Sequence, residues 1–308
     1  MTTKAAIHRP GSADRMLCAA GLKTLAGLVL TALLYLPVGL WAQESPKPWS
    51  EQAGDGMSVA QMEAEAQAHL QETPPNYPQA HLWFEQAANQ GSPQAAAYLG
   101  WLYEHGHGVE PDPSLAIAWY AQAVETGAHR YTLHLGWMHL NGELIPVDRV
   151  ASEAWFRRGI KADYAPARVA LASVWIADAT GGLEPHRTLE AETLLHEAHE
   201  QGEPNAVYFL ARLYLEGIGD VEADPDQAFH FTHQGAQAGH PTLQAWLSEL
   251  YLQGRGVEAN RVKAAKWASL SAAAGDPVGT QMLQLLQHEL DAEVLEAGRE
   301  QALAWLEN

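Results

Sequence analysis

Two stretches of the sequence decide the fold: YLGWLYEHGHGVEPDPSLAIAWYAQAVETG at 98–127 and WLSELYLQGRGVEANRVKAAKWASLSAAAG at 246–275. Both contain an apolar run, a G-x-G-V turn, the motif A-x-x-W and a closing glycine. Self-similarity at a fixed interval is typical of repeat proteins, whose units bury their apolar faces against their neighbours. The sequence therefore predicts an array of helix pairs.

The large residue of A-x-x-W recurs at intervals of 36, 36, 39, 37 and 36 residues. The slot holds Trp83, Trp119, Trp155, Leu194, Phe231 and Trp267. Small residues stand three before and four after it, which places all three positions on one helix face. We therefore predict that the large residue fills the core between close-packed helices. Eight residues after it stands a glycine, or Asp163 in one copy, suited to a left-handed helix end.

A helix marked by a leucine alternates with the A-x-x-W helix. Its core leucines, each eight residues past the glycine slot, are Leu99, Leu135, Leu171, Leu210 and Leu247. A small residue follows each leucine directly, and an aromatic residue or histidine stands four residues after it. We expect the three extra residues of the 39-residue interval to lie in a turn, near 180–185.

The unit A-x-x-x-L-G-x-x-Y-x-x-G-x-G-V followed by A-x-x-W-x-x-x-A-A-x-x-G resembles the Sel1-like repeat. This resemblance implies an all-α, right-handed α/α superhelical solenoid of about six helix pairs with capping helices at both ends. The expected organisation is a linker and N-terminal capping helix at 43–78, the solenoid at 79–290 and a C-terminal capping helix at 291–308. The copy from Leu171 to Gly202 is the weakest, because Asp178 replaces the turn glycine.

The first 42 residues are expected to lie outside the fold. Four basic residues precede the uncharged run TLAGLVLTALLYLPVGLWA at 24–42, which ends in the small residue Ala42. This pattern predicts a secretory signal peptide cleaved after Ala42, with Met16 as an alternative start. The alternative is an uncleaved inner-membrane anchor. Cleavage would also remove Cys18, the single cysteine, and leave a periplasmic or secreted chain without thiols.

The charge balance restricts the partners. With 37 acidic and 18 basic side chains, the chain carries a formal charge of −19. This excess opposes binding to nucleic acid or to anionic lipid. It permits a basic partner, although the simpler explanation is a solvated acidic surface that keeps the protein dispersed.

The sequence contains no constellation that predicts catalysis. There is no nucleophile motif and no phosphate-binding loop. His196 and His233 occupy equivalent slots in adjacent units, but HEAH lacks the i,i+4 spacing of the zinc proteases. His199 is expected to be a packed histidine. We therefore expect no metal, no cofactor and no catalytic residues.

A candidate binding surface lies on the leucine-bearing helices. The slots just before and two after each leucine point away from the predicted core. They hold the candidate partner-binding residues Tyr98, Trp101, His134, Trp137, Phe209, Arg212 and Trp246. By family resemblance, these helices line the concave side of the solenoid. The alternative is that these side chains pack against the next repeat.

The sequence-based prediction of function is an exported, non-catalytic scaffold. Its expected ligand is a peptide or protein of basic character, or an envelope glycan. The alternatives are an envelope hydrolase with Asp, Glu or His in the groove, and a structural subunit of a secretion or polysaccharide-export assembly.

Overall fold

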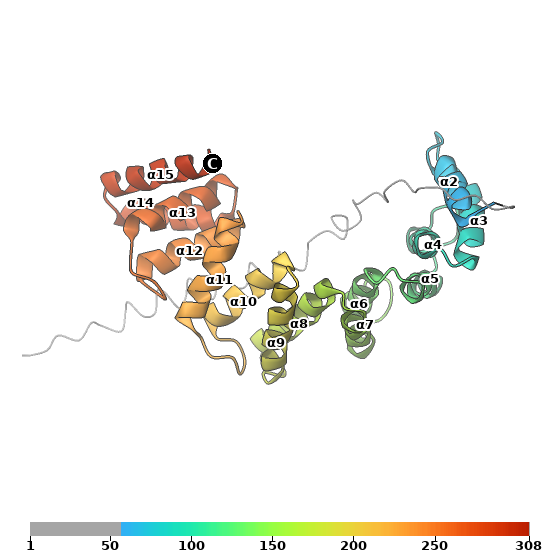
Figure 1. The fold of residues 1–308 in the computed structure, drawn as a ribbon, viewed down its shortest axis with the longest axis horizontal. Coiled ribbons are helices and arrows are strands. Elements are labelled where there is room, and N and C mark those ends of the chain that lie inside the picture. The colour runs from blue at the N-terminus through green and yellow to red at the C-terminus, as the bar shows by residue number, and fades with distance from the viewer. Residues whose placement is uncertain (1–56, 308) are drawn as a thin grey trace, which may run out of the picture. The chain divides into compact units, whose positions relative to one another are not determined.

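The computed structural model describes residues 57–307, and every regular element within them is an α-helix (Figure 1). The helices are α2 (Val59–Leu70), α3 (Tyr77–Asn89), α4 (Pro93–His105), α5 (Pro113–Glu125), α6 (Tyr131–Asn141), α7 (Arg149–Lys161), α8 (Ala165–Thr180), α9 (Arg187–Glu200), α10 (Pro204–Glu216), α11 (Pro225–Gln237), α12 (Pro241–Gln253), α13 (Arg261–Ala273), α14 (Pro277–Glu289) and α15 (Ala292–Leu306). Between residues 57 and 307, no helix is long and apolar enough to cross a membrane.

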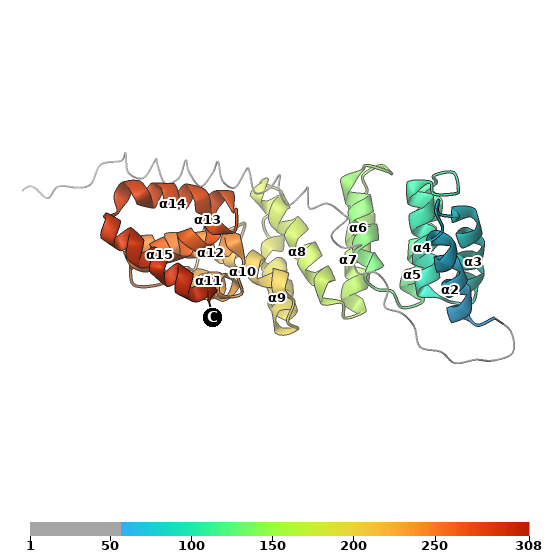
Figure 2. The same cartoon turned by 90° about the horizontal axis from the view of Figure 1, so that it is seen from above.

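Helices that follow one another in the chain pack side by side, and they form sequential pairs (Figures 1 and 2). The even-numbered helices from α4 to α12 carry the core leucines and are called first helices here. The odd-numbered helices from α3 to α13 carry A-x-x-W and are called second helices. Several first helices also contact the next one along, as α6 contacts α8 and α8 contacts α10. The predicted all-α organisation in helix pairs is confirmed.

Each second helix ends in the same hydrogen-bonded turn. The glycine slot adopts a positive φ in all six copies, including Asp163 at 57°. The amide after the slot donates to the carbonyl five residues earlier, as Tyr164 N does to Gly159 O at 3.0 Å. This is the Schellman pattern, which satisfies carbonyls at the helix end. The Asp163 carboxylate also accepts hydrogen bonds from Arg168 and Gln201, at 2.9 and 2.8 Å, so the non-glycine copy is held by its own side chain.

The turn between the helices of a pair is closed by a second recurring hydrogen bond. The N-cap residue of the second helix donates its amide to the carbonyl of the slot four after the leucine. In the turn after α4, this bond joins Asp112 N to Tyr103 O at 2.9 Å. Gly106 ends α4 in a left-handed conformation, and Asp112 Oδ1 accepts from two amides of α5. The glycines and the cap residue therefore fix where α5 begins.

Most of the predicted core positions are buried, but the tryptophan slot of A-x-x-W differs from the prediction in most copies. All five leucines are buried, as are the small residues three before and four after the tryptophan slot. However, Trp83, Trp119, Trp155 and Leu194 are only half-buried. The fully buried residue is the next one along, as in Phe84 and Phe156. The positions buried in every copy are thus i, i+4 and i+7, whereas the predicted i+3 position is buried only in the copies with Phe231 and Trp267.

Small residues allow the helices to approach closely. A Cβ atom built on Gly136 of α6 would lie 2.3 Å from the Phe156 ring of α7. One built on Gly159 of α7 would lie 2.6 Å from Ala167 Cβ of α8. Contacts below 3.0 Å cannot be accommodated without movement. These two slots therefore set the spacing within a pair and between pairs, respectively.

The long interval differs from the prediction. The three extra residues were expected in a turn, but α8 has 16 residues and runs to Thr180. The turn glycine that ends other first helices is absent, and Asp178 continues the helix while it pairs with Arg149. Asp178 does not adopt the left-handed conformation that ends the other first helices, and α8 extends by most of a turn.

The predicted capping helices correspond to α2 and α15. Ser58 and Gln61 form a capping box at the start of α2. In α15, the ring of Trp305 meets the ring of Trp267 edge-on, with centroids 6.0 Å apart. The predicted signal peptide and its alternative, an anchor, lie outside the described residues.

We expect Phe156→Ala to lower the free energy of unfolding by about 3–5 kcal/mol, because a buried aromatic side chain is removed from a close-packed contact. Trp155→Ala is the matched control, since its side chain is only half-buried. Urea denaturation followed by circular dichroism measures both. A larger loss for Trp155→Ala would show that the tryptophan slot, and not its neighbour, forms the core.

Candidate functional site

The seven candidate binding residues are less exposed than the sequence suggested. Tyr98, Trp101, His134, Trp137, Phe209 and Trp246 are all half-buried. Arg212 is buried, and its Nε atom lies 3.3 Å from Glu216 Oε1. The prediction that Arg212 points away from the core is therefore wrong: its guanidinium is covered and pairs with a carboxylate one turn along α10.

Trp101 belongs to a cluster of four rings that spans two helices and a turn. Its ring centroid lies 4.6 Å from that of His107 and 5.1 Å from that of His105. Tyr77, the first residue of α3, stacks on His107 at 4.7 Å. His105 is exposed and the other three rings are half-buried, so each ring contributes some surface. These four residues, Tyr77, Trp101, His105 and His107, are named the Trp101 cluster.

The sequence prediction included Trp101 but missed its three neighbours. Two of these neighbours, His105 and His107, flank the turn glycine Gly106. The available signal was their position at the end of α4 and between the turn glycines Gly106 and Gly108, because a tight turn brings side chains on its two sides together.

Acidic side chains predominate in the part of the sequence that carries the Trp101 cluster. Residues 57–129 contain eight carboxylates and no lysine or arginine. Five of the carboxylates have partners. Glu63 binds Ser92, and Glu104 binds Tyr120 and His134. Asp112 caps α5, Glu72 pairs with His69, and Glu125 pairs with Arg158 of α7. Glu110, three residues after His107, is exposed. The stretch that carries the cluster thus has no lysine or arginine of its own, and its exposed carboxylates such as Glu110 keep it acidic.

Tyr98 and His134 pack into the array instead of forming an open strip. Tyr98 stacks on Phe84 of the preceding helix, with ring centroids 4.6 Å apart. Burial raises the pKa of the Tyr98 hydroxyl. Trp137 meets the ring of Phe156 edge-on at 5.1 Å. Within the described residues no ring contact joins Trp101 to Trp137, so the expected contiguous strip is divided into local clusters.

Glu104 links three consecutive helices. Its Oε2 atom accepts a hydrogen bond from Tyr120 Oη at 2.6 Å and lies 3.0 Å from His134 Nε2. Burial alone would raise the pKa of Glu104, but His134 and Tyr120 outweigh it, so the pKa lies below its ordinary value of 4.5. Burial and the adjacent Glu104 carboxylate raise the pKa of Tyr120 far above its usual range. The triad therefore fixes α4, α5 and α6 to one another.

The predicted residues of the C-terminal half meet through Tyr208. Its ring stacks on Trp246 at 5.3 Å and meets Phe209 edge-on at 5.2 Å. Burial raises the pKa of Tyr208 to about 12, which keeps its hydroxyl protonated. These aromatic side chains join α10 to α12. This arrangement agrees with the alternative interpretation, in which the candidate residues pack against the next repeat.

The histidines considered as metal ligands have other partners. His196 Nε2 lies 2.9 Å from Tyr214 Oη, which also donates to Glu192. His233 stacks on Phe229, and burial, followed by the nearby Lys263 charge, lowers its pKa. His199 packs edge-on against Phe231, as expected. Across residues 57–307, no three histidine, cysteine or acidic side chains gather as metal ligands.

Comparison with known families identifies the fold. The Sel1 repeat model matches residues 65–92, 93–127, 132–164, 204–240 and 242–276, more than half of the chain. The chain therefore belongs to the Sel1 repeat family. The unmatched stretch between 165 and 203 contains α8 and α9, where the turn glycine is missing. No curated protein matches the chain.

One solved structure supports the fold with a TM-score above 0.5. A Sel1 repeat protein from Oxalobacter formigenes is 24% identical, with a TM-score of 0.57, over 79% of this chain and 95% of that one. A Sel1 repeat protein from Klebsiella pneumoniae is 20% identical, with a TM-score of 0.41, over 66% and 97%. A protective antigen of uropathogenic Escherichia coli with an SLR fold is 19% identical, with a TM-score of 0.40, over 81% and 69%.

We expect Glu104→Gln to lower the free energy of unfolding at pH 7 by about 1–3 kcal/mol, because a buried charge-assisted contact is lost. A folded-state pKa below 4.5 stabilises the fold above that pH, and this contribution disappears as the pH falls through the folded pKa. As the pH is lowered from 4.5, the free energy of unfolding of the variant should therefore fall less than that of the parent. Exposed Glu110→Gln is the control. Parallel acid profiles for Glu104→Gln and the parent would contradict the linkage.

Proposed function

We propose that this chain is an exported, non-catalytic scaffold that binds a peptide or protein segment of basic character. The observation that carries the proposal is the Trp101 cluster, in which four partly accessible rings lie together within an acidic stretch that has no lysine or arginine. Family membership supports it, because Sel1 repeats generally mediate protein interactions.

The chemistry of the cluster favours a cationic side chain. The face of a tryptophan or tyrosine ring attracts the ammonium of lysine and, more often, the guanidinium of arginine. Tryptophan and tyrosine also dominate binding energy at protein interfaces. Exposed carboxylates such as Glu110 would add long-range attraction and speed association. An uncharged envelope glycan would use the rings but gain nothing from the carboxylates.

The internal pairing of polar groups supports binding over catalysis. Glu104 and His134, which lie close enough for proton transfer, are held by Tyr120 between three helices. His196 is similarly held by Tyr214. A general acid or base must reach a substrate atom, and these groups are instead committed to joining repeats.

We expect Trp101→Ala to weaken capture of the partner by about 1–3 kcal/mol, in the range of an aromatic hot spot. The experiment captures envelope proteins on the immobilised parent, then measures the affinity of the recovered partner for each variant by calorimetry. Trp119→Ala is the matched control, because this half-buried tryptophan lies outside the Trp101 cluster. Binding should also weaken with salt, since charge attraction between exposed groups is screened.

Two results would contradict this proposal. Equal affinity of Trp101→Ala and Trp119→Ala would place the binding surface elsewhere. If an uncharged glycan binds independently of salt and Trp101→Ala abolishes that binding, the Trp101 cluster is the binding surface but its ligand is a glycan and not a basic protein.

Export is the second part of the proposal, and it rests on the apolar run at 24–42 after four basic residues. We expect the chain recovered from the periplasm or medium to begin at Gln43 and to carry 36 acidic and 14 basic side chains. Intact-mass spectrometry of the recovered protein measures this. An intact N-terminal segment in the membrane fraction would favour the anchor.

A further inference from the structure

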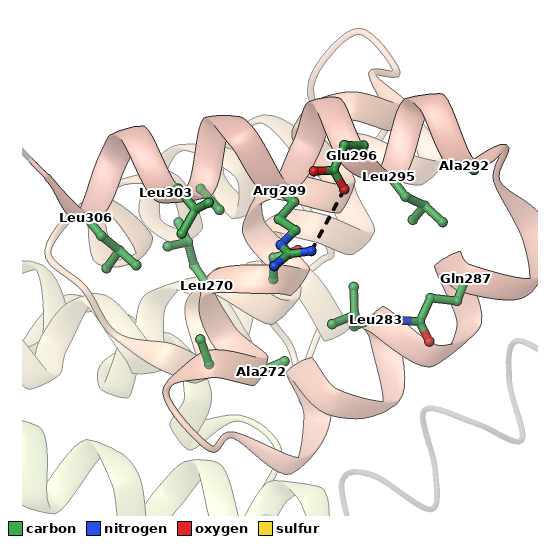
Figure 3. A pocket seen from close by; sticks show the side chains of 13 residues that line it. Leu270, Ala272, Leu283, Gln287, Ala292, Leu295, Glu296, Arg299, Leu303 and Leu306 are labelled. Carbon is green, nitrogen blue, oxygen red and sulfur yellow. Dashed lines mark ion pairs between the residues drawn. The ribbon is translucent and has the colours of Figure 1, made fainter.

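The C-terminal helices enclose an apolar groove with a volume of about 680 Å³. Figure 3 shows it between α14 and α15, with α13 contributing Leu270 and Ala272. Leu283 of α14 and Leu295 of α15 line its two sides, and Leu303 and Leu306 continue the lining along α15. Leu303 and Leu306 are 52% and 61% exposed, so much of this apolar lining faces solvent.

The groove exists because α15 packs on α13 and barely contacts α14 (Figure 2). A Cβ atom on Gly298 of α15 would lie 2.5 Å from Ala265 Cβ of α13, so these two helices approach closely. A Cβ atom on Gly279 would similarly meet Ser271 of α13. Both terminal helices are therefore attached to α13, and they diverge from one another.

The periodicity of the repeat indicates what normally covers this position. Leu283 stands eight residues after Gly275, which is the slot of the five buried core leucines. In the preceding repeats, a second helix packs along the first helix of the same pair. Leu283 is instead half-buried and lines the groove. The groove thus lies where α14 lacks a closely packed second helix.

We propose that this groove binds an amphipathic helix of another protein, with apolar residues on one face and lysine or arginine on the other. The lining residues of α15 recur with helical spacing from Ala292 to Leu306. Fourteen residue steps at about 1.5 Å give a length of about 21 Å. An elongated apolar groove of this kind suits a helix that anchors through positions i, i+3 or i+4, and i+7.

The charge of the segment that borders the groove favours one kind of partner. The charged residues of the lining, Glu296 and Arg299, form an ion pair with Arg299 Nη1 3.9 Å from Glu296 Oε2. The segment from residue 289 to residue 307 contains five further carboxylates and no other lysine or arginine, so the surroundings of the groove are acidic. A symmetric contact with a second copy would bring these carboxylates against themselves. A basic helix would bring opposite charges together. The site is separate from the Trp101 cluster and does not depend on the function proposed for that cluster.

The test uses fluorescence anisotropy with three designed 15-residue peptides and the purified chain. One peptide has leucines at i, i+4, i+7 and i+11 and lysines elsewhere, the second replaces lysine by glutamate, and the third scrambles the lysine peptide. We expect the lysine peptide alone to bind. The double variant Leu303→Gln/Leu306→Gln should weaken its binding about tenfold or more, since apolar anchors are lost.

The matched control is Leu183→Gln/Leu189→Gln, because these leucines are similarly exposed, at 59% and 50%, in α9 and the turn before it. All four positions are exposed, so helical content should be unchanged. Trp101→Ala should bind the peptide like the parent, which separates this site from the Trp101 cluster. Equal binding of the scrambled peptide, equal loss in both double variants, or a dimer that the groove variant dissociates would overturn the proposal.

Discussion

The rest of the structure depends on close approach between helices at positions without a bulky side chain. Gly100 and Gly136 follow core leucines, and Cβ atoms there would overlap the rings of Tyr120 and Phe156. Gly159 and Gly235 do the same against the next first helix. Because a closely packed interior tolerates little added volume, these small residues set the distance between helices. Since the small residues recur in each repeat, the same distance recurs along the array. The large aromatic side chains then fill the space that the small ones leave.

Much of the fold could be predicted from the sequence because spacing carries the information. The leucines and the small residues around the tryptophan slot, together with the helix-ending slot of Asp163, all recur in register. Two features could not be read in this way. In four of the six copies the residue in the tryptophan slot is only half-buried and the next residue is buried, because the helices face each other along i, i+4 and i+7, whereas A-x-x-W marks i and i+3. In α8, the missing turn glycine lengthened a helix, which a count of inserted residues cannot distinguish from a longer turn.

The candidate site was less predictable, for a different physical reason. Slots that point away from one core can still pack against a neighbouring repeat, as Tyr98 does on Phe84 and Trp246 does on Tyr208. The spacing along one helix therefore predicts which side chains point away from the core of that helix pair, but it does not predict whether they are exposed to solvent. The Trp101 cluster depends on the G-x-G turn, which brings His107 onto Tyr77 of the preceding helix. That contact joins residues separated by a whole helix, and no local period encodes it.

The two ends of the array differ in how they use the same repeat. At the N-terminal end, rings from consecutive elements stack on one another, and polar links such as Glu104 with His134 join successive repeats. At the C-terminal end, Gln284 and Gln287 of α14 replace the small and aromatic residues that follow the core leucine in complete repeats. A regular second helix has lost its close-contact position there, so α15 packs on α13 through Gly298 instead. In this chain, the changed contact slots of α14 coincide with the loss of the regular helix pairing. The leucine of that helix, retained from the repeat, is then left facing a groove.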